Sequence, residues 1–171
     1  MSAETTIDAP REEVFAFLVE LANRPSFTDH FISSYHLERI PSAGVGAAAR
    51  FRTGPRLSRV WMESVVDELD PPHRIVERGH AGRLDRIPVV AAWELVPGAG
   101  STTDVSVAFW TEPTHHLDRM RERLGARGWY HRRWGRALRR LKQVLEAGEP
   151  VKQLAVAGED RVPSLPSAVR H

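Results

Sequence analysis

The sequence contains no cysteine. This absence excludes disulfides, thiol nucleophiles and zinc–thiolate sites, so a metal site would need histidine and carboxylate ligands alone. His115 and His116 are candidates, with Asp118 nearby. Adjacent residues on a helix point about 100° apart, and no third ligand follows at helical spacing. We therefore predict no metal site and expect both histidines to be exposed near the start of a helix.

Long apolar runs are absent as well. No uninterrupted apolar stretch approaches the ~20 residues of a membrane span. The N-terminus, MSAETTIDAP, lacks the charged and apolar regions of a signal peptide. We therefore expect a cytoplasmic protein without stable membrane insertion.

A large excess of one charge is also missing, since the formal net charge is +2. The stretch GWYHRRWGRALRRLKQVLEAG, residues 128–148, is nevertheless rich in arginine. A basic helix face of this kind is usually just solvated, so we expect no nucleic-acid partner.

One glycine motif, GVGAAA at residues 44–49, formally fits the dinucleotide-binding pattern G-x-G-x-x-A. That pattern needs a helix after the glycines, because the helix N-terminus binds the pyrophosphate. Here ARFRTGP leads into another turn. We interpret the motif as a hairpin turn and predict no cofactor.

The chain has 171 residues, of which 42% are hydrophobic, enough for one domain with a substantial core. Helical spacing predicts a helix from about Pro10 to Leu21, interrupted by Pro25. Turn residues then separate runs rich in β-branched and aromatic residues, which predict strands at about 33–41, 46–53, 56–69, 73–80, 87–96 and 102–112. The short connections require antiparallel neighbours.

A long C-terminal helix is predicted by an apolar stripe that runs from Leu117 to Leu145 in steps of three and four residues. The glycines at 125 and 128 weaken its first half, so a kink there is expected. We predict one domain over residues 1–148 and a flexible tail over 149–171, where prolines are scattered without periodicity.

Several phrases of the sequence resemble one superfamily: TTIDAPREEVFAFLVELANRPSF, GVGAAARF, VVDELDPPHRIVERG, AAWELVPGAGSTTDVSV and WGRALRRLKQVLE. They look like the START-like, or SRPBCC, superfamily with its Bet v 1-like fold, and within it the polyketide cyclase/dehydrase and lipid-transport group. The resemblance implies an α+β helix-grip fold. In this fold a curved antiparallel sheet of about seven strands wraps around a long C-terminal helix, and two short helices follow the first strand. It also implies an internal cavity for hydrophobic or aromatic small molecules.

Candidate ligand-binding residues follow from side-chain periodicity. Trp93, Phe51 and Phe109 share strand faces with small or apolar residues and should point inward. Trp61 alternates with Arg59 and Glu63, which leaves its direction open. The complete candidate set is Tyr35, Phe51, Trp61, Trp93, Phe109, His131 and Trp134, with Glu77 and His80 as weaker polar candidates.

His131 lies on the predicted apolar stripe before Trp134. It is either a core histidine bonded to a backbone carbonyl or a residue that faces the cavity. Two functions are compatible with these residues. The first is a binding or carrier protein for a hydrophobic, polyketide- or lipid-like molecule. The second is a polyketide cyclase, aromatase or dehydratase in which His131 or Tyr35 moves protons.

Overall fold

The computed structural model describes residues 1–39, 41–55, 59–82, 87–111 and 127–147. The expected first half of the long helix, its kink, His115, His116, Asp118 and the predicted tail lie outside these residues. In the described part, the strands are β1 (Ser2–Ile7), β2 (Ser33–Leu37), β3 (Ala48–Thr53), β4 (Val60–Asp70), β5 (Arg74–Ala81), β6 (Ile87–Pro97) and β7 (Thr103–Thr111). The helices are α1 (Arg11–Val19), the 3-10 turn η1 (Leu21–Asn23), α2 (Arg24–Thr28) and α4 (Arg127–Ala147).

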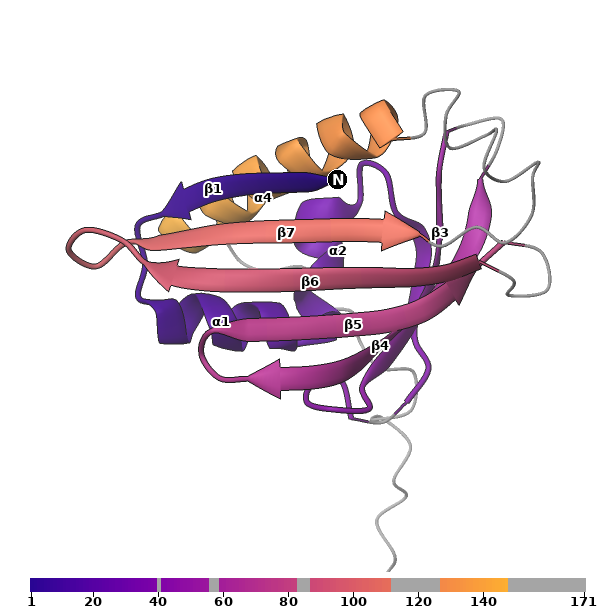
Figure 1. Cartoon of the computed structure of the whole chain (residues 1–171), viewed down its shortest axis with the longest axis horizontal. Coiled ribbons are helices and arrows are strands. Elements are labelled where there is room, and N and C mark those ends of the chain that lie inside the picture. The colour runs from indigo at the N-terminus through magenta and orange to yellow at the C-terminus, as the bar shows by residue number, and fades with distance from the viewer. Residues whose placement is uncertain (40, 56–58, 83–86, 112–126, 148–171) are drawn as a thin grey trace, which may run out of the picture.

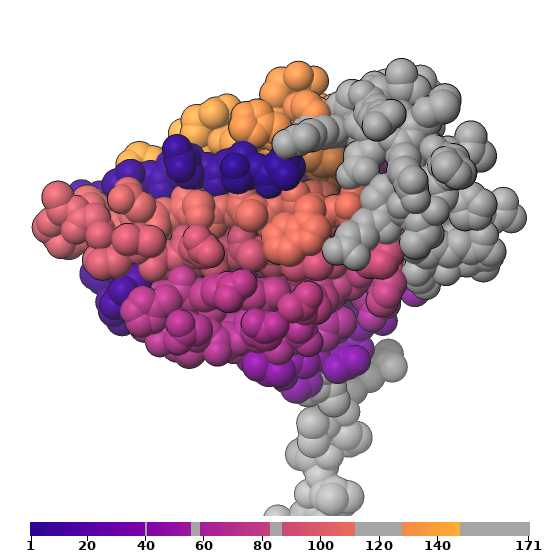
Figure 2. Space-filling model, viewed as in Figure 1, coloured from indigo at the N-terminus to yellow at the C-terminus, as the bar shows by residue number. Residues whose placement is uncertain are grey.

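These strands form one antiparallel sheet with the order β1-β7-β6-β5-β4-β3-β2. The helices lie on one side of it, and β3 turns away from the direction of β6 and β7, so the sheet encloses the helix side (Figure 1). The predicted helix-grip α+β fold is therefore confirmed. Figure 2 views the opposite face, where β1, β7, β6 and β5 pack side by side.

Strands β4 and β5 approach each other closely at Gly79. A Cβ atom at Gly79 would lie 1.8 Å from the backbone oxygen of Glu63. Only glycine fits at such a distance. The β4–β5 register also shifts between Val66 and Glu68, which marks an irregularity of the kind that bends a strand.

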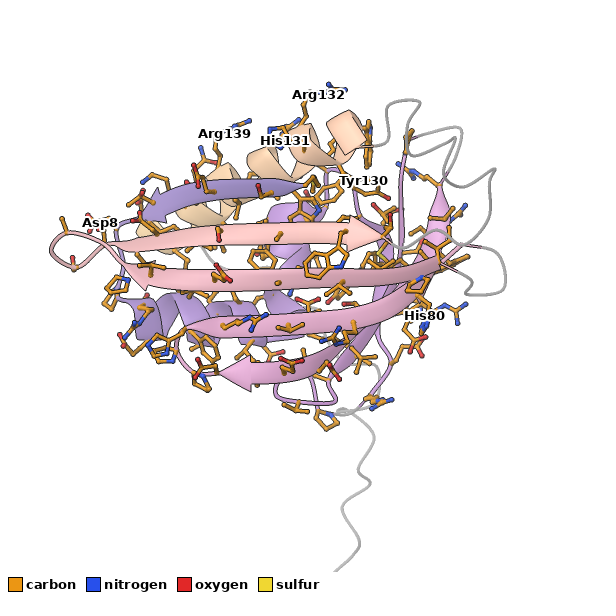
Figure 3. All side chains as sticks on the ribbon, viewed as in Figure 1. Asp8, His80, Tyr130, His131, Arg132 and Arg139 are labelled. Carbon is orange, nitrogen blue, oxygen red and sulfur yellow. The ribbon has the colours of Figure 1, made fainter. Side chains whose placement is uncertain are left out.

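Helix α4 packs its apolar stripe against the concave side. Trp134, Ala137, Leu138 and Leu141 are buried. Full burial of a leucine side chain stabilises the fold by about 1.5–3 kcal/mol. Arg132 and Arg139 are exposed and point away from the sheet (Figure 3). The arginines therefore lie mainly off the stripe, as predicted.

The same helix covers the edge of β1, which would otherwise present unpaired backbone groups. Lys142 Nζ donates to the carbonyl oxygen of Thr6 at 2.7 Å, and the backbone N–H of Asp8 donates to Glu146 Oε1 at 2.7 Å. His131 Nδ1 lies 2.9 Å from the carbonyl oxygen of Ser2. Helix α4 thus serves both as core and as edge cover.

Candidate functional site

A cavity lies between the concave face of the sheet, the η1–α2 segment and α4. Much of its wall is aromatic and comes from elements far apart in the sequence: Phe31, Tyr35, Phe51, Phe109, Tyr130 and Trp134. Ala49 and Ala91 line it between these rings, and their small side chains leave the space that the rings surround. Strand periodicity explains this placement, because Ala49 and Phe51, like Ala91 and Val89, are two residues apart and share a face.

The cavity is narrow. The empty space among its lining residues measures about 550 Å³, a volume that includes space continuous with solvent. Only about 30 Å³ is open to the centre of a water molecule. One water needs roughly 10–15 Å³ of such space. A ligand with fused rings must therefore move side chains of the lining as it enters.

The rings contact one another in the geometries that aromatic pairs prefer. Tyr35 and Phe51 stack with centroids 5.7 Å apart and an interplanar angle of 17°. Phe31 meets Trp134 edge-to-face at 5.4 Å, and Phe109 lies 5.3 Å from Tyr130. A flat apolar molecule that enters the cavity can form stacked or edge-to-face contacts like those that the rings make with one another.

A buried ion pair forms the polar part of the lining. Arg24 Nη2, from α2, donates to Glu77 Oε1, from β5, at 2.6 Å. The same oxygen accepts from Trp93 Nε1 at 3.0 Å, and Ser64 Oγ donates to Glu77 Oε2 at 2.8 Å. Arg24 and Glu77 are 5% and 4% exposed. Charges this deeply buried persist only when they are paired and hydrogen-bonded, as here.

Within the part of the chain that the structure describes, the Arg24 guanidinium retains unused donors. It carries five N–H groups, and among the described residues Glu77 is the one hydrogen-bond partner of its side chain. The Arg24 Cζ atom lies 4.9 Å from the Trp93 ring centroid, so the cation is also stabilised by the face of an aromatic ring. Arg24 thus lines the cavity as a fixed donor.

Two further polar atoms at the cavity are unpaired. Trp134 Nε1 and Thr53 Oγ1 are buried and have no hydrogen-bond partner among the described residues. Both residues line the cavity. An unsatisfied buried donor costs about 1–3 kcal/mol of stability. A ligand that supplied an acceptor would recover part of this cost.

The two tyrosines of the cavity are held neutral. Burial raises the pKa of Tyr35 far above its usual value, although the nearby Arg24 charge opposes the shift. Its hydroxyl donates to the backbone oxygen of Leu21 at 2.8 Å. Burial likewise raises the pKa of Tyr130, and the Thr53 side chain opposes that shift. Thr53 approaches the Tyr130 phenol without forming a well-aligned hydrogen bond.

The structure brings four of the predicted residues together in the cavity wall: Tyr35, Phe51, Phe109 and Trp134. Glu77 joins them. Trp93 points inward but is fully buried behind the ion pair. Its Nε1 donates to Glu77, and the Arg24 guanidinium lies over its ring. Trp93 therefore supports the cavity without lining it.

Trp61 lies outside the cavity. Its neighbour Met62 lines the cavity, so Trp61 points to the outer face by strand alternation, where it is 38% exposed. The guanidinium carbons of Arg50 and Arg52 lie 5.4 and 5.7 Å from the centroid of its ring. Its place in the candidate ligand-binding set is not supported. His80 also lies on the outer face, toward one end of the sheet (Figure 3).

The structure places His131 in neither of the two predicted positions, although its ring does contact a backbone carbonyl, as one of them required. Its side chain is exposed beside β1 and is not part of the cavity lining, so it is neither a core histidine nor a cavity residue. A residue three positions before Trp134 lies about 60° from it around a helix. This angle is enough to bring His131 off the buried stripe, and Tyr130 takes the cavity position instead.

Arg24, Thr53 and Tyr130 line the cavity but were not predicted from the sequence. Nothing in the sequence distinguishes Arg24 from the other arginines. Tyr130 had a signal, because its spacing of four residues to Trp134 continues in Leu138.

No group of histidine and acidic side chains within the described ranges could hold a metal ion. Of the helices described, none is both long and apolar enough to cross a membrane.

A search of curated proteins finds no match to the sequence. Solved structures do share the fold. TTHA0849 from Thermus thermophilus has a TM-score of 0.70 and 17% identity, over 88% of this chain and 99% of that protein. Truncated norcoclaurine synthase from Thalictrum flavum has a TM-score of 0.64 and 12% identity, over 85% and 91%.

The di-domain ARO/CYC protein StfQ from the steffimycin biosynthetic pathway has a TM-score of 0.58 and 13% identity, over 87% of this chain and 45% of StfQ. At these identities the likeness concerns the fold alone. The sequence comparison goes further, because the family described as "Polyketide cyclase / dehydrase and lipid transport" matches residues 1–146, nearly all of the described fold. The chain belongs to the polyketide cyclase / dehydrase and lipid transport family.

Proposed function

We propose that the protein binds a hydrophobic or aromatic small molecule, polyketide- or lipid-like, in this cavity and acts as a carrier or binding protein. The observation that carries the proposal is the cavity itself, an aromatic wall with a polar group that is already paired. Ligand sites in proteins are typically concave and apolar with a few fixed polar groups. The family description, which names polyketide chemistry and lipid transport, supports the same class of ligand.

The state of the polar groups favours binding over catalysis. A general base needs a free lone pair within hydrogen-bond reach of the substrate. Glu77 accepts hydrogen bonds from Arg24, Trp93 and Ser64. Tyr35 is bonded to a backbone oxygen and has a raised pKa. Two of the cavity groups that could move a proton, Glu77 and Tyr35, are therefore engaged in the fold.

A test of binding uses N-phenyl-1-naphthylamine, a neutral dye whose fluorescence rises in apolar surroundings. We expect saturable binding by the wild type and at least a tenfold loss with Ala91→Leu, which fills the cavity from β6. Ala108→Leu is the matched control, because Ala108 is not among the cavity residues and its two neighbours on β7 point inward. No saturable binding by the wild type, or equal losses in both variants, would overturn the proposal.

A cyclase, aromatase or dehydratase that uses the same cavity is the second candidate. The family description and the fold shared with StfQ support it. The spare N–H groups of Arg24 could donate hydrogen bonds to a substrate carbonyl oxygen and so polarise that carbonyl for aldol closure. The test is the product ratio of a linear polyketone with and without the protein. An unchanged ratio counts against the enzyme, and a ratio that changes and reverts with Tyr35→Phe supports it.

A further inference from the structure

Two donor groups of the cavity lining are not used within the described part of the fold. Arg24 has N–H groups beyond the one that Glu77 accepts, and Trp134 Nε1 has no partner among the described residues. Both adjoin Trp93: the Arg24 Cζ lies 4.9 Å from its ring centroid, and the Trp134 ring lies 5.5 Å from it, edge-to-face. Both residues therefore contact Trp93, and both line the cavity.

The charge of this wall is already balanced. Arg24 and Glu77 neutralise each other at 2.6 Å, and both are buried. A ligand carboxylate in the cavity would add a negative charge without a free counter-charge, and burial of an unpaired charge is strongly unfavourable. A neutral carbonyl oxygen accepts the same hydrogen bonds without this cost.

We propose that Arg24 and Trp134 make the cavity selective for apolar molecules that carry a neutral hydrogen-bond acceptor, such as a ketone, over hydrocarbons and over carboxylates. This inference rests on the proposed ligand binding and names the polar group that the ligand must carry. Trp134 supplies the donor for the acceptor, and Arg24 supplies a second donor whose charge Glu77 cancels.

The first experiment compares two probes of nearly equal shape, 2-acetylnaphthalene and 2-isopropylnaphthalene, by isothermal titration calorimetry. Trp134→Phe retains an aromatic ring and removes the N–H group. We expect this variant to bind the ketone about tenfold more weakly and the hydrocarbon with unchanged affinity. Because each probe is compared with itself, differences in probe hydrophobicity cancel. Trp61→Phe, on the outer face, is the control and should affect neither probe.

The second experiment adds 2-naphthoate at pH 7.5, where it is ionised, and measures the shift in melting temperature. The wild type should be stabilised less by 2-naphthoate than by the ketone. Glu77→Gln leaves the Arg24 charge unpaired, so this variant should bind 2-naphthoate more tightly than the wild type does. The comparison remains valid if the variant melts at a lower temperature, because the shift is measured relative to its own unliganded form.

The outcomes separate the two claims. If both neutral probes bind and Trp134→Phe weakens both equally or neither, the inference is wrong and the proposed binding function stands. If 2-naphthoate binds the wild type as tightly as the ketone, the preference for a neutral acceptor is wrong. If no probe and no dye binds, the proposed function is wrong and the inference falls with it.

Discussion

Arg24 Nη2 and Glu77 Oε1 lie 2.6 Å apart, and neither side chain is more than 6% exposed. One residue comes from a short helix and the other from the middle of the sheet, 53 positions later. The pair therefore joins α2 to β5 and also forms part of the cavity lining. A change in this pair should therefore affect both the stability of the fold and the binding of a ligand.

Glu77→Ala should destabilise the protein by about 3–5 kcal/mol, because it leaves the Arg24 charge buried without a partner. The measurement is the free energy of unfolding in urea. Arg78→Ala on the same strand is the control: Arg78 pairs with Asp67 and Glu68 on the exposed face and should matter little. Replacing both charges, with Arg24→Met and Glu77→Gln together, should cost less than Glu77→Ala. A larger loss in the double variant would contradict this account.

Gly79→Ala should destabilise the protein by about 1–3 kcal/mol, because its Cβ would overlap the backbone oxygen of Glu63. Gly135→Ala provides a contrast within α4. There the nearest atom to the added Cβ is a flexible arginine nitrogen at 3.9 Å, so the gain in helix propensity should stabilise the protein by about 0.5–1 kcal/mol. Thermal unfolding of both variants checks the opposite signs.

Much of this fold could be predicted from residue patterns, because turns and strand alternation are local properties. Phe51 and Phe109 lie in the cavity wall for the reason that alternation gives: they share inward faces with Ala49 and Val107. The resemblance to the superfamily added the curvature and the packing of the long helix. Local pattern and family likeness together were therefore enough to locate the cavity.

The polar part of the site could not be predicted in the same way. The Arg24–Glu77 contact joins positions far apart in the sequence, and only the folded chain shows which arginine is buried. The position of His131 could not be predicted for a different reason. Both Tyr130 and His131 lie at helical spacing from Trp134, four and three residues before it, and the sequence spacing alone does not show which of the two faces the cavity.

His131→Ala should leave dye and ketone binding unchanged, since the side chain contacts Ser2 at the β1 edge and does not line the cavity. We expect a loss of stability of about 0.5–1.5 kcal/mol, the usual net value of one hydrogen bond. Hydrogen exchange should increase in β1 rather than around the cavity. A tenfold loss of binding in this variant would show that His131 reaches the ligand.

His30 should make stability fall as the solution becomes acidic. Burial lowers its pKa below the usual 6.5, and the charges of Arg136, Arg140 and Arg133 act in the same direction, while the backbone oxygen of Arg133 at 3.2 Å opposes them. Arg140 also pairs with Asp29 beside the ring.

The sign of this effect follows from proton binding. Between the two pKa values the unfolded chain binds more protons at His30 than the folded chain, so acid favours unfolding. The contribution is fully present above the unfolded pKa of about 6.5 and is lost as the pH falls through the lower folded value. Melting temperatures at pH 7.5 and 5.0 should therefore differ less in His30→Gln than in the wild type. Equal differences in the two proteins would exclude His30 as a source of the acid sensitivity.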